Sequence, residues 1–144
     1  MTSFHMALGI AVLATNGAAG GWGAVSWLRS APSVWFWYLL RLAQAAVAAQ
    51  VIGGFLLLAR GETAPDGLHI AYGVAPLVIT LVSEGLRLSA AQRELDAVED
   101  LDALERPEQI AVARRVALAE LGVMTVGALL ILTLALRAYQ TGGP

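Results

Sequence analysis

The two histidines of this chain carry its clearest ligand chemistry. His5 comes directly before the first long apolar segment, and His69 lies at the start of the third. A glycine follows each histidine four residues later, so Gly9 and Gly73 share a helix face with the two imidazoles. Two imidazoles held at similar depth on different helices can bind one iron from both sides, and glycine beside them leaves room for a flat ring. The pattern predicts a haem b site.

Two more side chains are predicted to hydrogen bond around the bound haem, namely Asn16 and Tyr72. The segments Phe4-His5-Met6 and Leu68-His69-Ile70-Ala71-Tyr72-Gly73 resemble the histidine-bearing span ends of small four-helix b-type transmembrane cytochromes. That resemblance implies a role in electron transfer or haem handling, with both histidines as axial ligands. Larger members of this class carry two histidine pairs, whereas this chain has one.

Two other interpretations of the histidine pair stay open at the level of sequence. His5 and His69 are also candidate metal ligands, because imidazole together with the thioethers of Met1 and Met6 favours Cu(I). Alternatively, each imidazole makes an ordinary hydrogen bond to a backbone carbonyl or to water. Since the chain has no cysteine, zinc knuckles, thiol chemistry and disulfides are excluded.

A second group of polar residues is electrostatic. Arg41, Glu84 and Glu120 are the charged residues inside the predicted spans, and all three lie at nearly the same depth. A lone charge there costs at least about 2.5 kcal/mol on insertion scales, so we expect one arginine to face both carboxylates, with Gln44 adding hydrogen bonds. This buried charge cluster is interpreted either as a clamp between helices or as the proton or ion site of a transporter or membrane-complex assembly subunit.

The elements that position these residues follow from composition. The chain has 144 residues, of which 58% are hydrophobic and 14% charged, and its mean hydropathy is +0.68. Apolar segments of membrane-spanning length cover residues 6–28, 34–59, 68–86 and 116–136. The predicted fold class is therefore all-α, a single transmembrane domain built as an up-and-down four-helix bundle in the lipid bilayer.

Residues 87–115 form a charged arm between the third and fourth spans. The arm contains five arginines and seven acidic residues, and its leucines and valines recur every three residues, which predicts a helical extension of the third span. Pro107 suits the first turn of the helix that follows. The acidic residues are interpreted as a solvated helix face, with docking of a basic partner as the alternative.

Arginine distribution predicts the orientation. Six arginines fall on the side of the arm and two on the opposite side, which places the arm in the cytosol and both termini outside a plasma or inner membrane. All nine basic residues are arginine and the net charge is −2, so a nucleic-acid partner is not expected.

Polar residues within the spans also bear on partners and activity. Gln50 lies about 180° around its helix from Arg41, so we expect a second interface, supplied by a homo-oligomer or a partner membrane subunit. The alternative is that its amide hydrogen bonds to a carbonyl of a neighbouring helix. No phosphate-binding loop, nucleophile elbow or hydrolase carboxylate pair is visible, and whether the chain is an enzyme stays open.

Overall fold

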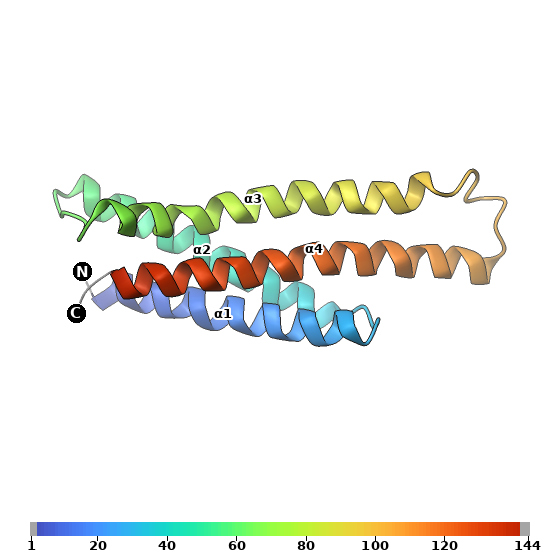
Figure 1. The fold of residues 1–144 in the computed structure, drawn as a ribbon, viewed down its shortest axis with the longest axis horizontal. Helices are drawn as coiled ribbons and strands as arrows, with labels where there is room; N and C mark the ends of the chain where they lie inside the picture. Colours follow the sequence, from blue (N-terminus) through green and yellow to red (C-terminus); the bar gives the residue numbers. More distant parts are fainter. Residues whose placement is uncertain (1–2, 142–144) are drawn as a thin grey trace.

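The computed structural model describes residues 3–141, and this part of the chain is four α-helices with no strand. The helices are α1 (Ser3–Leu28), α2 (Val34–Ala59), α3 (Gly67–Asp96) and α4 (Arg106–Thr141). Figure 1 shows that successive helices run in alternate directions, so that α1 begins and α4 ends at the same end of the molecule. The all-helical fold and the number of helices are as the sequence predicts.

All four helices are long and apolar enough to cross a membrane, judged by length and composition. The bounds of α2 are those predicted, whereas α1 begins three residues before its predicted span. In α3 and α4 the helix continues well beyond the apolar stretch, and Figure 1 shows these two extensions projecting together past the turn between α1 and α2. The arm is therefore built largely from the ends of two helices.

The arm is not helical throughout. Helix α3 ends at Asp96 and α4 begins at Arg106, so the regularly spaced Val98, Leu101 and Leu104 lie in the connecting loop. The physical reason is local, because the Asp100 carboxylate accepts hydrogen bonds from the backbone N–H groups of the second and third residues after it. Such a turn competes directly with helix formation. The expectation of helix at these three positions is wrong, while Pro107 does lie in the first turn of α4.

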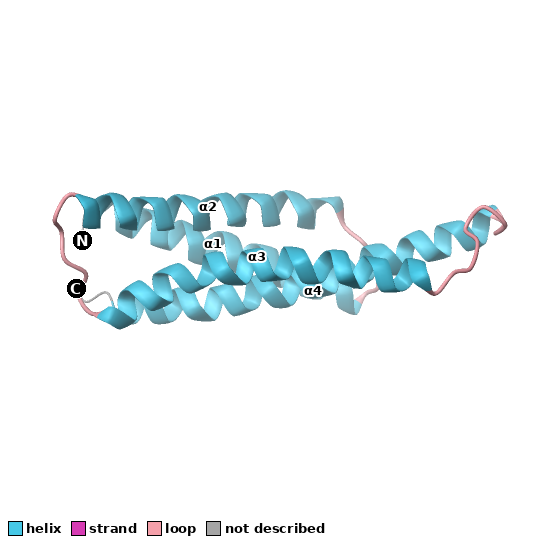
Figure 2. Ribbon diagram, turned by 90° about the horizontal axis from the view of Figure 1, so that it is seen from above, coloured by secondary structure: helices cyan, strands magenta, loops and turns pink. Residues whose placement is uncertain are grey.

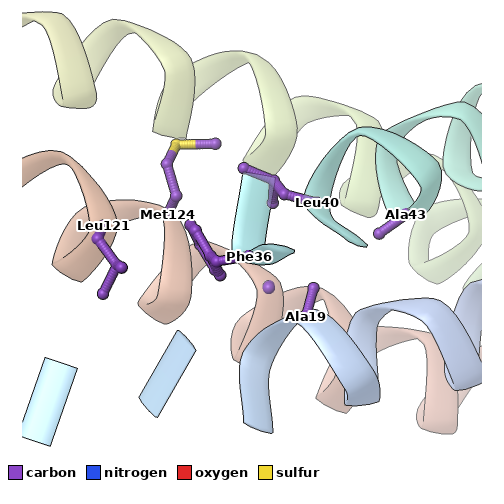
Figure 3. Packing of buried hydrophobic residues seen from close by; sticks show 7 residues of the cluster. Ala19, Phe36, Leu40, Ala43, Leu121 and Met124 are labelled. Atoms are coloured by element: carbon purple, nitrogen blue, oxygen red, sulfur yellow. The ribbon is translucent and has the colours of Figure 1, made fainter. Parts of the chain in front are cut away.

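The core consists of two buried clusters along the bundle. One cluster, drawn in Figure 3, joins α1, α2 and α4 and consists of Ala19, Phe36, Leu40, Ala43, Leu121, Met124 and Ala128. The other lies nearer the end where α1 begins and consists of Val12, Val47, Ile131 and Ala135. The side chains of both clusters are almost completely buried, while many other large apolar side chains are exposed on the outside of the helices.

Glycine allows α1 to approach its neighbours closely. A Cβ atom added at Gly23 would collide with the side chains of Thr125 and Phe36, and one added at Gly20 would lie 2.7 Å from Leu129 Cδ2. Small residues at such positions let helix backbones pack at short range without a hydrophobic driving force. The face of α1 that carries Gly20 and Gly23 is thus its packing face, which is buried against α4 and α2.

Helix α2 is the least embedded in the bundle at one end. Figure 2 shows that α2 diverges from α3 and α4 toward the loop that joins α2 to α3. Gly61 adopts a φ of 85° where α2 ends, a conformation that glycine adopts without strain. The divergence leaves space between α2 and α3 at the end of the bundle that carries the two histidines.

Candidate functional site

A helix cap fixes the position of His69. Asp66 precedes α3 in an extended conformation, and its side chain accepts a hydrogen bond of 2.7 Å from the backbone N–H of His69. This is the usual role of aspartate at a helix N-cap, and it sets His69 in the first turn of α3. His5 lies in the first turn of α1, where its side chain is buried. Both imidazoles therefore lie at the same end of the bundle.

The structure brings the two histidines together. The ring centroids of His5 and His69 are 6.2 Å apart, and the two ring planes are inclined at 59°. The sequence predicted this shared depth from the position of each histidine at the end of an apolar segment. The two rings come from helices that do not pack directly on each other, so the pair depends on the packing of both α1 and α3 against α4.

Gln50 is a third member of this site that sequence reasoning assigned elsewhere. The Gln50 Nε2 atom lies 3.2 Å from His5 Nε2. The buried face of α2 runs from Phe36 to Val51, and Gln50 flanks it on the side of α1. Gln50 thus has a partner on a neighbouring helix of the same chain, as the alternative interpretation expects, although that partner is a side chain rather than a backbone carbonyl. Self-association stays a prediction, without support from Gln50.

Two cavities meet at the histidine pair. The larger has a volume of about 340 Å³ and lies between α2, α3 and their connecting loop, and the smaller has a volume of about 50 Å³ and reaches toward α4. Both cavities are lined by His5, Gln50, His69, Gly73 and Ala138. The larger volume lies within the range of small-molecule sites. The two imidazoles thus border both cavities.

Two buried polar atoms of the site lack a hydrogen-bond partner among the described residues. They are the Oε1 atom of Gln50 and the Nδ1 atom of His69. A buried polar atom without a partner costs about 1–3 kcal/mol, and each case in a native protein calls for an explanation. A ligand that lies between the histidines, or water, would supply the missing contacts.

Of the two side chains predicted to support a haem, the structure places one at the site. Tyr72 lines the smaller cavity together with Pro76 of the next turn. Asn16 lies 11 residues after His5, which is about 16 Å along a helix, and its side chain donates a hydrogen bond of 2.9 Å to the Val12 carbonyl. Asn16 lines neither cavity at the histidine pair. The prediction that Asn16 hydrogen bonds around a haem held by these histidines is therefore wrong.

The charge cluster lies far along the bundle from the histidines. The Arg41 guanidinium donates a hydrogen bond of 2.6 Å to Glu84 Oε1, and Gln44 Nε2 donates one of 2.8 Å to the same oxygen. Arg41, Gln44 and Glu84 therefore contact one another as the sequence predicts. Glu120 differs, because its carboxylate is bonded to another arginine.

That arginine is Arg87, which sequence reasoning placed at the cytosolic boundary and outside the cluster. Its Nε donates to Glu84 Oε2 at 2.9 Å and its NH1 donates to Glu120 Oε1 at 2.8 Å, while the guanidinium lies 5.5 Å from the ring centroid of Trp37. The expectation that Arg41 alone faces both carboxylates is wrong. The signal was present in the spacing, because residues three apart in a helix are neighbours.

The network as a whole is electrically balanced. Two arginines and two glutamates connect α2, α3 and α4, and both oxygens of Glu84 accept hydrogen bonds. A carboxylate satisfied in this way is stabilised in its charged form. This arrangement favours the clamp interpretation over a site that takes up and releases protons.

The geometry gives little support to a metal ion bound directly by His5 and His69. Among residues 3–141 there is no group of three or more histidine, cysteine or acidic side chains that could hold a metal ion. Met6 lines the smaller cavity with both histidines, and Met1 lies outside the described residues. The site therefore offers two imidazoles and one nearby thioether, fewer ligands than a closed zinc site uses.

The chain matches no family model, no curated protein and no solved structure.

Proposed function

We propose that this protein binds haem b in a membrane, with His5 and His69 as the two axial ligands of the iron. The observation that carries the proposal is the 6.2 Å separation of the two ring centroids. Imidazole nitrogens bind metals at about 2 Å, so two imidazoles on opposite sides of one iron have centroids about 6 Å apart. The proposed function is a redox or haem-handling role.

The inclination of the rings is compatible with this arrangement. Each axial imidazole plane contains the line through the iron and its coordinating nitrogen, so the two planes are free to differ in rotation about that line. An angle of 59° between the planes therefore does not oppose ligation of a common iron. When bound, the haem iron would supply one-electron chemistry, and the two histidines would set its ligand field.

Space around the imidazoles supports a flat ligand. A Cβ atom added at Gly73 would meet nothing within 4 Å, and one added at Gly54 would lie 3.4 Å from His5 Cε1. Larger residues at these positions would therefore point into the space at the histidine pair. The outer part of the larger cavity is lined by loop residues 62–65, so the polar edge of a ligand would face water there.

We further propose that all four helices cross the membrane and that both termini face away from the cytosol. Large apolar side chains are exposed along all four helices, including Ile10, Ile52, Leu81 and Leu130, and lipid is the solvent that such a surface suits. The arginine-rich end would be cytosolic. On this orientation the histidine pair lies near the outer face and the charge network lies in the cytosolic half.

Titration of purified, haem-free protein with haemin tests the proposed function. We expect a Soret band that saturates at one haem per chain, and we expect His5→Ala and His69→Ala each to weaken binding strongly because each removes an axial ligand. Asn16→Ala is the matched control, because Asn16 is a buried polar residue of α1 remote from the pair. A featureless titration, or equal binding by all variants, would contradict the proposal.

The charge network carries a second candidate function. As an alternative, we propose a membrane-complex assembly subunit or a transporter organised around Arg41, Gln44, Glu84 and Glu120, because these side chains gather where α2, α3 and α4 meet. The charge balance of the network favours the assembly form over the transporter form. Glu84→Gln and Glu120→Gln in proteoliposomes test the transporter form. Proton flux abolished by both variants would support it, and absence of flux in the unmodified protein would contradict it.

A further inference from the structure

The contact between Gln50 and His5 has a defined chemical direction. The side-chain nitrogen of glutamine is a hydrogen-bond donor and carries no lone pair for accepting. In the tautomer of His5 that carries its proton on Nδ1, His5 Nε2 accepts a hydrogen bond from Gln50 Nε2, which lies 3.2 Å away. This tautomer directs the Nε2 lone pair at the Gln50 amide.

The same lone pair is the one that would bind iron. A metal takes a neutral imidazole through an unprotonated nitrogen, and in this tautomer that nitrogen is Nε2. The amide of Gln50 and an iron atom therefore compete for one atom of His5. Among the described residues, no side chain makes a comparable hydrogen bond to the ring of His69. The two axial positions are thus unequal in the haem-free protein.

We propose that Gln50 is a latch that occupies the iron-binding nitrogen of His5 when haem is absent, so that the site is built for exchange of haem. This inference rests on the proposed haem site. Loading of haem would require the hydrogen bond between Gln50 and His5 Nε2 to open, so that Nε2 becomes available as a ligand of the iron. On release, Gln50 takes the nitrogen back.

The two cavities leave space into which the Gln50 side chain can move. Gln50 lines both the larger and the smaller cavity, and its Oε1 atom has no hydrogen-bond partner among the described residues. The amide is therefore held on the His5 side through its nitrogen alone. Because the hydrogen bond must be broken before haem binds, it weakens haem binding. The free energy of one hydrogen bond corresponds to a change of about two- to tenfold in the dissociation constant.

Gln50→Leu and Gln50→Ala test the inference, with Gln44→Leu as the matched control. Gln44 is on the same helix, but its amide donates to Glu84 in the charge network. The first measurement is made without haem and records the ¹⁵N chemical shifts of the His5 ring nitrogens in lipid nanodiscs. We expect both Gln50 variants to move the Nε2 resonance and the Gln44 variant to leave it unchanged.

The second measurement is the equilibrium dissociation constant for haem, obtained by competition with apomyoglobin. Both Gln50 variants should bind haem about two- to tenfold more tightly than the unmodified protein, and Gln44→Leu should bind equally. Weaker or unchanged binding by the Gln50 variants would overturn the latch while leaving the haem site intact. Absence of haem binding by the unmodified protein would instead overturn the proposed function. The nitrogen shifts separate these cases because they report the Gln50 contact in the empty site.

Discussion

Replacing Arg87 by leucine is the most informative perturbation of the fold. Arg87 is the residue that joins Glu84 to Glu120, with distances of 2.9 and 2.8 Å to the two carboxylates. Its removal leaves Glu84 with Arg41 and Gln44, but it takes away the arginine bonded to Glu120. The network then changes from two positive and two negative charges to one positive and two negative.

The expected loss in the free energy of unfolding follows from how exposed the side chains of Arg87 and Glu120 are. The side chains of Arg87 and Glu120 are 21% and 20% exposed, which is well buried although not completely. Removing one partner of a fully buried pair costs about 3–5 kcal/mol, whereas exposed pairs contribute about 0.2–1 kcal/mol. We therefore expect Arg87→Leu to lower the free energy of unfolding by about 2–3 kcal/mol. The double variant with Glu120→Leu restores charge balance, and its cost should be less than that of Arg87→Leu alone.

The assay is reversible unfolding in mixed micelles, followed by tryptophan fluorescence, for the two single variants and the double variant. Arg115→Leu is the control, because Arg115 pairs with Glu94 at 3.4 Å in the arm and its side chain is 52% exposed. That control should cost less than about 1 kcal/mol. The reasoning is refuted if Arg87→Leu costs no more than the control, or if the double variant costs at least the sum of the single variants.

Three further predictions concern packing and the cavity. Gly23→Val should lower the free energy of unfolding by about 1–3 kcal/mol, because its Cβ would collide with Thr125. Gly21→Val should be tolerated, because a Cβ at this position meets no atom within 4 Å. Thermal unfolding of the two variants compares them. Gly73→Phe should abolish haem binding with helix content retained, because it fills the cavity from an open position, and haemin titration with circular dichroism checks both. Glu62→Gln should tighten haem binding severalfold at low salt, since Glu62 lines the cavity and repels the propionates; a salt series of dissociation constants tests this.

Hydropathy alone predicts the four helices because each must present a long apolar surface. The bounds of α2 follow directly, since an arginine and a proline-containing turn lie before it and a charged, glycine-containing loop lies after it. The meeting of His5 and His69 is also foreseeable, because residues at the same depth of an antiparallel bundle lie at the same end. Depth along each helix is therefore readable from the sequence.

The rotation of each helix about its own axis is harder to predict from the sequence than its depth. The partners of Gln50 and Arg87 were not predicted because these partners, His5 and Glu120, lie on other helices. A helical repeat gives the angle between two residues of one helix, but it gives no angle between helices. Gln50 and Gln44 illustrate this, since both flank the buried face of α2, one toward α1 and the other toward α3.

Electron paramagnetic resonance of the ferric, haem-loaded protein tests the central claim most directly. With His5 and His69 both bound to one iron, we predict a low-spin signal, and ¹⁵N labelling of histidine should produce hyperfine coupling from two ring nitrogens. His69→Ala should convert the iron to a high-spin form, because the second strong-field ligand is lost. A high-spin signal from the unmodified protein, or coupling from a single histidine, would contradict the account.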